Sequence, residues 1–326
     1  MFIQILILLL SLMTLVYSAD KFVFGASSLA RNFGISPMII GLTIVAMGSS
    51  APEMMIAATA SLQGNPDTAV GNAIGSNITN IALVLGVTAL FHPLSVSSST
   101  VKREIPLILF VTAIATYILA NSDFSFNEGL LLMIGFVLYI ATLLIVTLKR
   151  AKQNKISDKL VIEAEQEVPD AVSKPRSAFW LMFGMILLPL SASYLVDSSI
   201  FIAKAFGISD LVIGLTVIAI GTSLPELAAS IMSIIKKEDD LAMGNIIGSN
   251  IFNILAVLSL AGLISPGNID QAVAARDAPY MLATTVLLFI LCFSRGGKFR
   301  ITRAKGLLLL AVFVSYQILL FSQLKA

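Results

Sequence analysis

The feature that most constrains this chain is a proline–glutamate motif inside an apolar segment, which occurs twice. Residues 41–53 read GLTIVAMGSSAPE and residues 214–226 read GLTVIAIGTSLPE, with eight of thirteen positions identical. Residues 71–80 (GNAIGSNITN) and 244–253 (GNIIGSNIFN) share eight of ten positions. Both pairs have the same offset of 173 residues (214 − 41 and 244 − 71). A constant offset across two separate motifs indicates that the whole architecture is an internal repeat.

The composition places these motifs in a membrane. The chain has 326 residues, of which 57% are hydrophobic and only 12% are charged, and its mean hydropathy is +0.93. A soluble core of this size needs less apolar surface, whereas stacked membrane spans need this much. The net charge of +2 is small and scattered, so no nucleic-acid partner is indicated. The single cysteine, Cys292, excludes a disulfide framework and a thiolate metal site.

About ten apolar windows are long enough to cross a hydrocarbon layer of about 30 Å. We expect spans near residues 2–19, 37–62, 69–91, 104–120, 128–148, 177–203, 211–235, 241–264, 277–293 and 305–322. The apolar N-terminus lacks a basic start and a cleavage site, so we interpret it as the first span and not as a signal peptide. Basic residues follow the odd-numbered spans, as at Lys102 and Arg103. The positive-inside rule then predicts a multi-pass membrane protein with both termini outside.

The two halves contain five predicted spans each, so they are expected to have opposite orientations in the membrane. The predicted fold class is an all-α polytopic membrane protein built from two inverted five-helix repeats. We expect the first repeat at residues 1–148 (motif 41–80) and the second at 177–326 (motif 214–253). Residues 149–176 carry carboxylates without EF-hand spacing, so they are interpreted as a cytoplasmic connecting loop. Many secondary transporters are inverted repeats that bind their substrate near the midplane between the halves.

The first motif combines a charge, two hydroxyls and a helix breaker. An intramembrane carboxylate such as Glu53 costs ~2.5–3.5 kcal/mol on insertion scales, which makes it a functional-site hypothesis. Ser49 and Ser50 precede it by four and three residues, so on a helix all three side chains share one face. Pro52 lacks an N–H and crowds the carbonyl of Gly48. Freed carbonyls are tolerated in lipid only where they are buried in protein or line a cavity.

The second motif supplies the same groups from the other half. They are Thr222, Ser223, Pro225 and Glu226. Two facing carboxylates would not both stay ionised without a cation. Their oxygens suit Ca²⁺, which takes six to eight oxygen ligands, and the motifs hold no thiolates or imidazoles to favour zinc or copper. Beside them, a serine and an asparagine four residues apart offer neutral oxygens suited to Na⁺, at Ser76 and Asn80 and at Ser249 and Asn253.

These paired segments, GxxxxAxGxSxPE and GNxxGSNIxN, resemble the α-repeats of the calcium/cation antiporter superfamily, and the chain is similar to bacterial inner-membrane sodium/calcium antiporters. The resemblance implies that Glu53 and Glu226 are the central Ca²⁺ carboxylates, assisted by Ser49 and Thr222. It implies Na⁺ ligation by Ser50, Ser223, Ser76 and Ser249 and by backbone oxygens of Ala46 and Ala219, in addition to the amides of Asn80 and Asn253 named above. A location in the plasma (inner) membrane is implied in the same way. Some members carry an aspartate at the position of Asn80 or Asn253. It also implies that the first and sixth spans slide over a rigid core of the other eight.

The expected function is therefore an antiporter that takes Na⁺ in and moves Ca²⁺ out, with no permanent cofactor and no implied protein partner. A Ca²⁺/H⁺ antiporter with the same glutamates is the first alternative, and a passive cation channel is the second. An intramembrane hydrolase is a third alternative, but the sole histidine, His92, lies near an expected interface and neither motif holds a GxSxG elbow. We therefore expect a transporter and not an enzyme. The glycines of residues 71–75 and 244–248 form GxxxG patterns, which favour close helix packing.

Overall fold

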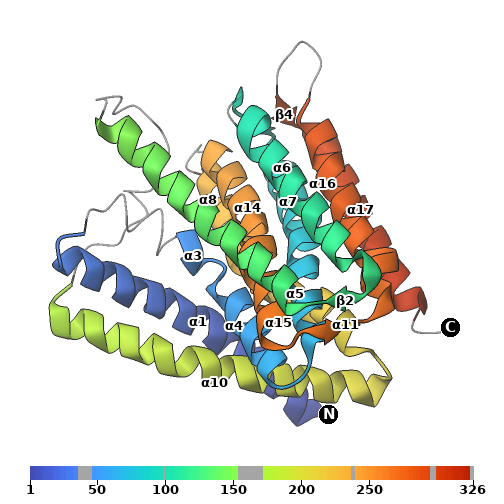
Figure 1. Cartoon of the computed structure of the whole chain (residues 1–326). Coiled ribbons are helices and arrows are strands. Elements are labelled where there is room, and N and C mark those ends of the chain that lie inside the picture. The colour runs from blue at the N-terminus through green and yellow to red at the C-terminus, as the bar shows by residue number, and fades with distance from the viewer. Residues whose placement is uncertain (36–45, 99, 153–171, 236–238, 294–298, 324–326) are drawn as a thin grey trace.

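A computed structural model describes residues 1–35, 46–98, 100–152, 172–235, 239–293 and 299–323. Within these ranges nine helical segments are long and apolar enough to cross a membrane. They correspond to nine of the ten predicted spans. The remaining one, 37–62, begins in a part of the chain that the structure does not describe. Its described part is two helices, α3 (Ala46–Gly48) and α4 (Ala51–Leu62). The protein is thus the predicted all-α membrane fold (Figure 1).

The elements of the first half follow one another in a simple order. After α1 (Phe2–Asn32), α3 and α4 come α5 (Pro66–Ile78), the π-helical η2 (Thr79–Val84), α6 (Leu85–Phe91), β1 (Leu94–Ser95), the π-helical η3 (Thr100–Glu104), α7 (Ile105–Ile118), the 3₁₀ turn η4 (Leu119–Asn121), β2 (Asp123–Phe124) and α8 (Phe126–Lys152).

The second half repeats this order. It comprises α10 (Lys174–Phe206), α11 (Asp210–Ile213), the π-helical η5 (Gly214–Ile218), α12 (Ala219–Thr222), α13 (Leu224–Ile235), α14 (Asp239–Phe252), the π-helical η6 (Asn253–Val257), α15 (Leu258–Ile264), β3 (Gly267–Asn268), the π-helical η7 (Val273–Asp277), α16 (Ala278–Cys292), β4 (Arg300–Ile301) and α17 (Arg303–Gln323).

The repeat extends far beyond the two sequence motifs. The starts of α4 and α13 (224 − 51), of α5 and α14 (239 − 66), of α6 and α15 (258 − 85) and of η3 and η7 (273 − 100) all differ by 173 residues. The starts of β2 and β4 (300 − 123) and of α8 and α17 (303 − 126) differ by 177. The second half therefore has four additional residues between α16 and β4. The same helices recur where the sequences no longer match visibly, so the two halves share one fold.

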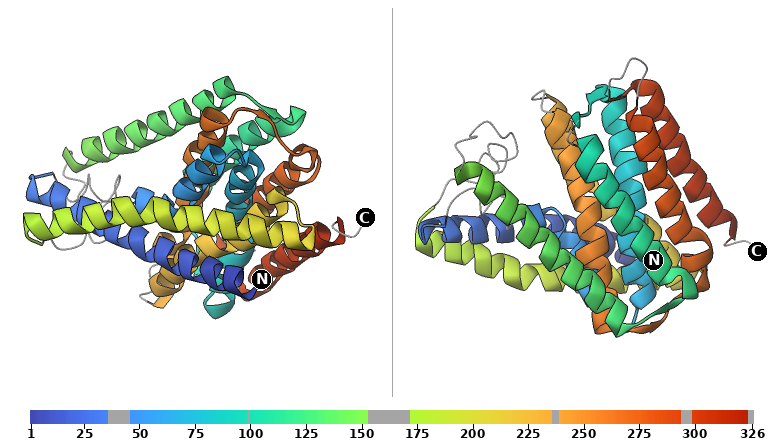
Figure 2. Two further views of the ribbon diagram at one scale, coloured as in Figure 1. Left: turned by 90° about the horizontal axis from the view of Figure 1, so that it is seen from below. Right: turned by 45° about the horizontal axis from the view of Figure 1, so that its top comes forward.

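The helices α1 and α10 form a separate antiparallel pair along one side of the bundle, strongly inclined to the other helices (Figures 1 and 2). Two glycines allow their backbones to touch. A Cβ atom on Gly25 would lie 2.3 Å from the backbone nitrogen of Leu181, and one on Gly184 would lie 2.7 Å from the Cα of Phe22. The predicted end of the first span at residue 19 was wrong. The helix continues to Asn32 because polar residues such as Ser28 bond across this contact, to Ser177 at 2.8 Å.

The motif helices occupy the centre of the bundle. The spans that contain α5 and α14 are 78% and 83% buried over their most apolar window, against 11% for α8 and 28% for α17. This difference in burial explains the small and polar residues of α5 and α14, because helices enclosed by protein tolerate such residues better than lipid-facing helices do. Short antiparallel strand pairs, β1 with β4 and β2 with β3, join the two halves at the helix ends. The centre of the molecule is thus built from both repeats.

Candidate functional site

The predicted helix interruption is present at the same place in both motifs. Helix α3 ends at Gly48 and α4 begins at Ala51, while α12 ends at Thr222 and α13 begins at Leu224. The backbone angles of Ser50 (φ −91°, ψ 7°) and Ser223 (φ −84°, ψ 0°) are nearly the same. This region of the backbone map is sparsely populated and is frequent in active sites. Each break presents a buried serine whose hydroxyl has no hydrogen-bond partner in the described structure.

The two glutamates both lie in the protein interior, within electrostatic range of each other. The exposed fraction of Glu53 is 0% and that of Glu226 is 1%, and the two carboxylates are close enough to interact electrostatically. Neither carboxylate oxygen of Glu53 has a hydrogen-bond partner among the described residues, and Oε2 of Glu226 also has none. A charged oxygen in such a place is costly unless a counter-charge reaches it. Three carboxylate oxygens are therefore available to a cation.

A chain of hydroxyls connects the first motif with the second carboxylate. Ser249 Oγ donates to Glu226 Oε1 at 3.3 Å, and Ser49 Oγ lies 3.5 Å from Ser249 Oγ. Because the Ser249 proton is directed at the carboxylate, Ser49 is the donor in the second contact. Ser76, the equivalent of Ser249, is fully buried and its hydroxyl has no partner in the described ranges. The structure thus places Ser49, Ser249 and Glu226 beside one another, whereas Ser76 makes no equivalent hydrogen bond in the described structure.

Thr222 reaches toward Glu53 from the other half. Its hydroxyl lies in electrostatic range of Glu53 and shares its hydrogen among three acceptors: Ile218 O at 3.1 Å, Ala219 O at 3.4 Å and Asn72 Oδ1 at 3.5 Å. The Ala219 carbonyl also accepts the N–H of Ser223 at 3.1 Å. A cation at this carbonyl would therefore take the place of the threonine hydroxyl. Ala46, the equivalent of Ala219, begins α3, and the role of both backbone oxygens stays a prediction.

The asparagines Asn80 and Asn253 lie at the start of the π-helical segments, Asn80 as the second residue of η2 and Asn253 as the first of η6. Both are buried, and the Oδ1 atom of each has no hydrogen-bond partner within the described part of the chain. Single π-helical turns in α-helices are frequent at functional sites, because they redirect side chains that a regular helix would place elsewhere. The described residues hold no group of three or more His, Cys, Asp or Glu side chains that could bind a metal. An ion here would depend on two carboxylates and on neutral oxygens.

Sequence reasoning missed three asparagines. Asn72 is fully buried, and its amide donates a hydrogen bond to the backbone oxygen of Glu53 at 3.2 Å. It also accepts a hydrogen bond from the Thr222 hydroxyl, so it connects α5 with α4 and with the second motif. Asn250 accepts a hydrogen bond from Asn80, and Asn77 donates to Met281 Sδ at 3.5 Å. The signal was present, because the GN and SN pairs of both repeats contain these residues. A buried amide on a central helix needs polar partners, so these repeated asparagines indicate polar contacts inside the bundle.

The glycines of the first half confirm close helix packing. A Cβ atom on Gly71 would lie 2.6 Å from Leu211 O, and one on Gly75 would lie 2.7 Å from Ala219 Cβ. Helix α5 therefore rests directly on α11, η5 and α12, and this contact brings the motifs of the two halves together. The equivalent glycines of α14, Gly244 and Gly248, have no described atom within 4 Å of such a Cβ.

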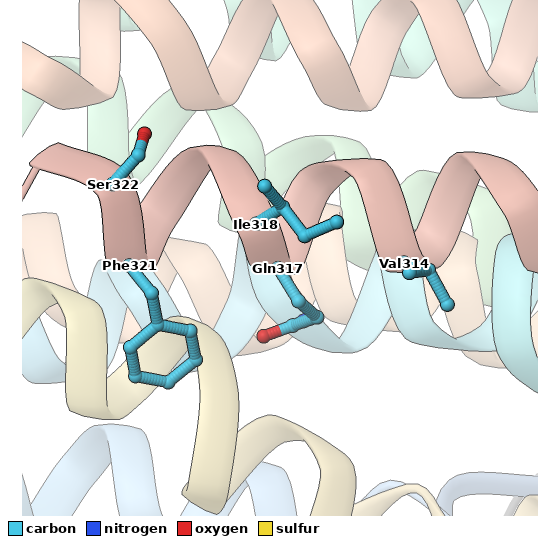
Figure 3. Close-up of a pocket in the computed structure, with 5 residues that line it drawn as sticks. All are labelled: Val314, Gln317, Ile318, Phe321 and Ser322. Carbon is cyan, nitrogen blue, oxygen red and sulfur yellow. The ribbon is translucent and has the colours of Figure 1, made fainter.

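A hollow of about 540 Å³ on α17 lies apart from these residues. It is lined by Val314, Gln317, Ile318, Phe321 and Ser322 (Figure 3). Its walls come from one helix, and none of the predicted ion ligands takes part. It is therefore not a part of the candidate site.

Comparison with known proteins agrees with this geometry. The model of the sodium/calcium exchanger protein family matches residues 3–145 and 176–322, which covers most of both halves. The chain belongs to this family. It is 52% identical over 322 residues to CaxA, a candidate antiporter of Alkalimonas amylolytica, covering 99% of this chain and 100% of that protein. It is 42% identical to the inner membrane protein YrbG of Escherichia coli K12, covering 97% and 96%.

Solved structures of an exchanger have the same fold. The sodium-calcium exchanger NCX_Mj, soaked with 2.5 mM Na⁺ and 0.1 mM Ca²⁺, is 31% identical, covers 96% of each chain and gives a TM-score of 0.59. Members of this family are membrane exchangers and not enzymes, which excludes the hydrolase alternative. The protein is thus a multi-pass membrane transporter of the cation exchanger family.

Proposed function

We propose that the protein exchanges Na⁺, moving inward, for Ca²⁺, moving outward, at one site between its halves. The observation that carries this proposal is the pair of buried carboxylates, Glu53 and Glu226, with three oxygens that lack partners in the described structure. Ca²⁺ prefers oxygen ligands from carboxylates, carbonyls and neutral side chains. The hydroxyls and amides around the carboxylates add such ligands and suit Na⁺ as well.

Each predicted ligand is assigned to one of the two transported ions. Glu53 and Glu226 bind Ca²⁺ directly, and the hydroxyls of Ser49 and Thr222 complete that site. Na⁺ is held by the remaining neutral oxygens, those of Ser50, Ser223, Ser76, Ser249, Asn80 and Asn253 and the backbone oxygens of Ala46 and Ala219. The same carboxylates neutralise whichever ion is bound, so Na⁺ and Ca²⁺ compete for the centre.

Coupling follows from the charge of this centre. Two empty carboxylates in a buried site carry a large desolvation penalty, which a Ca²⁺ ion or two or more Na⁺ ions remove. Only the loaded forms then pass through the occluded state, and exchange results instead of a leak. The pair α1 and α10 is in close contact through Gly25 and Gly184, which supports movement of the two helices as one unit over the core.

The test is ⁴⁵Ca²⁺ uptake into proteoliposomes loaded with Na⁺. We expect uptake that depends on the outward Na⁺ gradient and that Glu53→Gln or Glu226→Gln abolishes, because each removes one charge without changing shape. Glu128→Gln is the matched control, since Glu128 caps its own helix through Ser125 at 2.7 Å, away from the site. ⁴⁵Ca²⁺ uptake that does not depend on the Na⁺ gradient, or that is unchanged in both glutamate variants, would contradict the proposal.

A pH gradient in the same vesicles separates the main alternative. In a Ca²⁺/H⁺ antiporter the glutamates would be protonated in turn, so a proton gradient alone would drive uptake in Na⁺-free buffer. We expect no such uptake. A passive channel would show Ca²⁺ flux without any counter-ion. Vesicles that contain no Na⁺ and have no pH gradient test for such a flux.

A further inference from the structure

Two buried amides form a direct link between the repeats at the level of the candidate site. Asn80 Nδ2, from η2 of the first half, donates to Asn250 Oδ1, from α14 of the second half, over 3.1 Å. The exposed fraction of both side chains is 0%. Asn250 lies next to Ser249 on α14 and three residues before Asn253, the first residue of η6, so its neighbours in the sequence are predicted ion ligands.

This bond decides which end of the Asn80 amide is available. A primary amide has a donor end and an acceptor end of nearly equal shape, and only the oxygen can bind a cation. The Asn80 nitrogen is occupied by Asn250, whereas Oδ1 of Asn80 is buried and has no hydrogen-bond partner in the described ranges. Without an acceptor for the nitrogen, the amide could turn and place its NH₂ group where the oxygen now lies.

We propose that Asn250 is a positioning residue that fixes the Asn80 amide with its oxygen toward the transported Na⁺. This inference rests on the proposed function, because it assigns a role within the same site. Asn250 acts through Asn80 and does not itself bind the ion: its oxygen accepts the Asn80 N–H, and its remaining polar atom is a donor nitrogen that repels cations.

The equivalent pair in the other half is present but not joined. Asn77 and Asn253 correspond to Asn250 and Asn80 by the 173-residue offset (250 − 77 and 253 − 80). Asn77 Oδ1 and Asn253 Nδ2, the two atoms that the equivalent bond would use, are both buried and have no partner among the described residues. Instead, Asn77 donates to Met281 Sδ. The repeat therefore has the parts for the same bond twice, and this conformation forms it once.

The experiment measures the Na⁺ concentration that gives half-maximal ⁴⁵Ca²⁺ uptake, together with the maximal rate. Asn250→Leu keeps the approximate shape and removes the acceptor. We expect the half-saturating Na⁺ concentration to rise about fivefold or more, a factor equivalent to about 1 kcal/mol, with the maximal rate at saturating Na⁺ changed less than about twofold. Thr88→Val controls for the loss of a buried hydrogen bond away from the site, since Thr88 donates to Val84 O at 2.7 Å.

A double-mutant cycle separates positioning from a general structural role. Asn80→Asp replaces the amide by a carboxylate, whose two ends are both oxygens, so it has no wrong orientation. In that background Asn250→Leu should have little further effect on Na⁺ dependence. Equal effects of Asn250→Leu in both backgrounds, or an unchanged half-saturating Na⁺ concentration in the single variant, would overturn the proposal.

A second assay and the behaviour of the unmodified protein separate failure of the positioning role from failure of the proposed function. If Asn80→Asp does not transport, the Na⁺ dependence of the apparent melting temperature in detergent replaces the flux assay, and the same shift and the same non-additivity are required. If the unmodified protein shows no Na⁺-driven uptake, the proposed function fails. If it shows such uptake and only the Asn250 result is negative, the positioning role alone fails.

Discussion

Ser249 Oγ donates a hydrogen bond to Glu226 Oε1 at 3.3 Å, and this contact shows how unequal the two halves of the site are. Its equivalent in the first half would join Ser76 to Glu53, yet the hydroxyl of Ser76 and both carboxylate oxygens of Glu53 have no partner in the described structure. The two repeats have nearly the same motifs in different local arrangements. That difference leads to a first prediction.

Ser249→Ala and Ser76→Ala should differ in their effects on stability. A typical buried hydrogen bond contributes about 0.5–1.5 kcal/mol, so Ser249→Ala should lower the free energy of unfolding by about 1 kcal/mol in ion-free detergent. Ser76→Ala removes a hydroxyl that has no partner among the described residues, so it should change stability little. Apparent melting temperatures of both variants check this. Equal losses would show that the asymmetry is not a property of the ion-free protein.

The close contact of α5 with the second motif predicts a second matched pair. Gly75→Ala would place a Cβ atom 2.7 Å from Ala219 Cβ and 2.8 Å from Leu215 Cα, which are difficult to move. Overpacking of this kind costs about 1–3 kcal/mol, so the melting temperature should fall. Gly135→Ala on α8, where the added Cβ atom would meet only the flexible end of the Leu255 side chain at 3.3 Å, should be tolerated. A similar loss in both variants would contradict this prediction.

A buried ion pair gives a third prediction. The Asp277 carboxylate is fully buried, contacts Arg276 Nε at 2.7 Å and accepts a hydrogen bond from Tyr316 at 2.8 Å. Breaking a buried pair by removing one charge costs about 3–5 kcal/mol, so Asp277→Asn should destabilise strongly. Tyr316→Phe removes one hydrogen bond and should cost about 1 kcal/mol. Thermal unfolding in detergent measures both losses.

The control for this prediction is the pair of Lys21 and Asp20 on α1, whose Asp20 side chain is 67% exposed. Exposed pairs contribute about 0–1 kcal/mol, so Asp20→Asn should leave the melting temperature nearly unchanged. A large loss there would mean that surface charge, and not burial, determines these effects.

A fourth prediction concerns orientation. The single cysteine, Cys292, is fully buried, so the unmodified protein should react little with a cysteine-labelling reagent. The charge bias of the loops predicts that Asp123→Cys reacts with an impermeant maleimide on intact cells, whereas Lys102→Cys reacts only after the membrane is opened. Both positions are exposed. The reverse pattern would place the termini in the cytoplasm and invert the proposed orientation.

The sequence could predict the features that are local or periodic. The 173-residue offset, the proline that interrupts each motif helix and the GxxxG pattern at Gly71 and Gly75 depend on chain order and local sterics, and the structure confirms all three. The intramembrane glutamates were identifiable for a similar reason, because a charge in an apolar segment is costly wherever the segment packs. The length of α1 was not predictable, since its last three turns depend on contacts with α10.

By itself, then, the sequence determined a membrane fold of two related halves, each with one carboxylate beside a helix break. Only the tertiary structure decided which oxygens of the two halves meet. The bond from Asn80 to Asn250, the hydrogen bond from Thr222 to Asn72 and the contact of Gly75 with Leu215 all join residues about 140 to 170 positions apart. Repeated motifs give both halves the same groups, whereas packing two halves against each other gives each group a different neighbour.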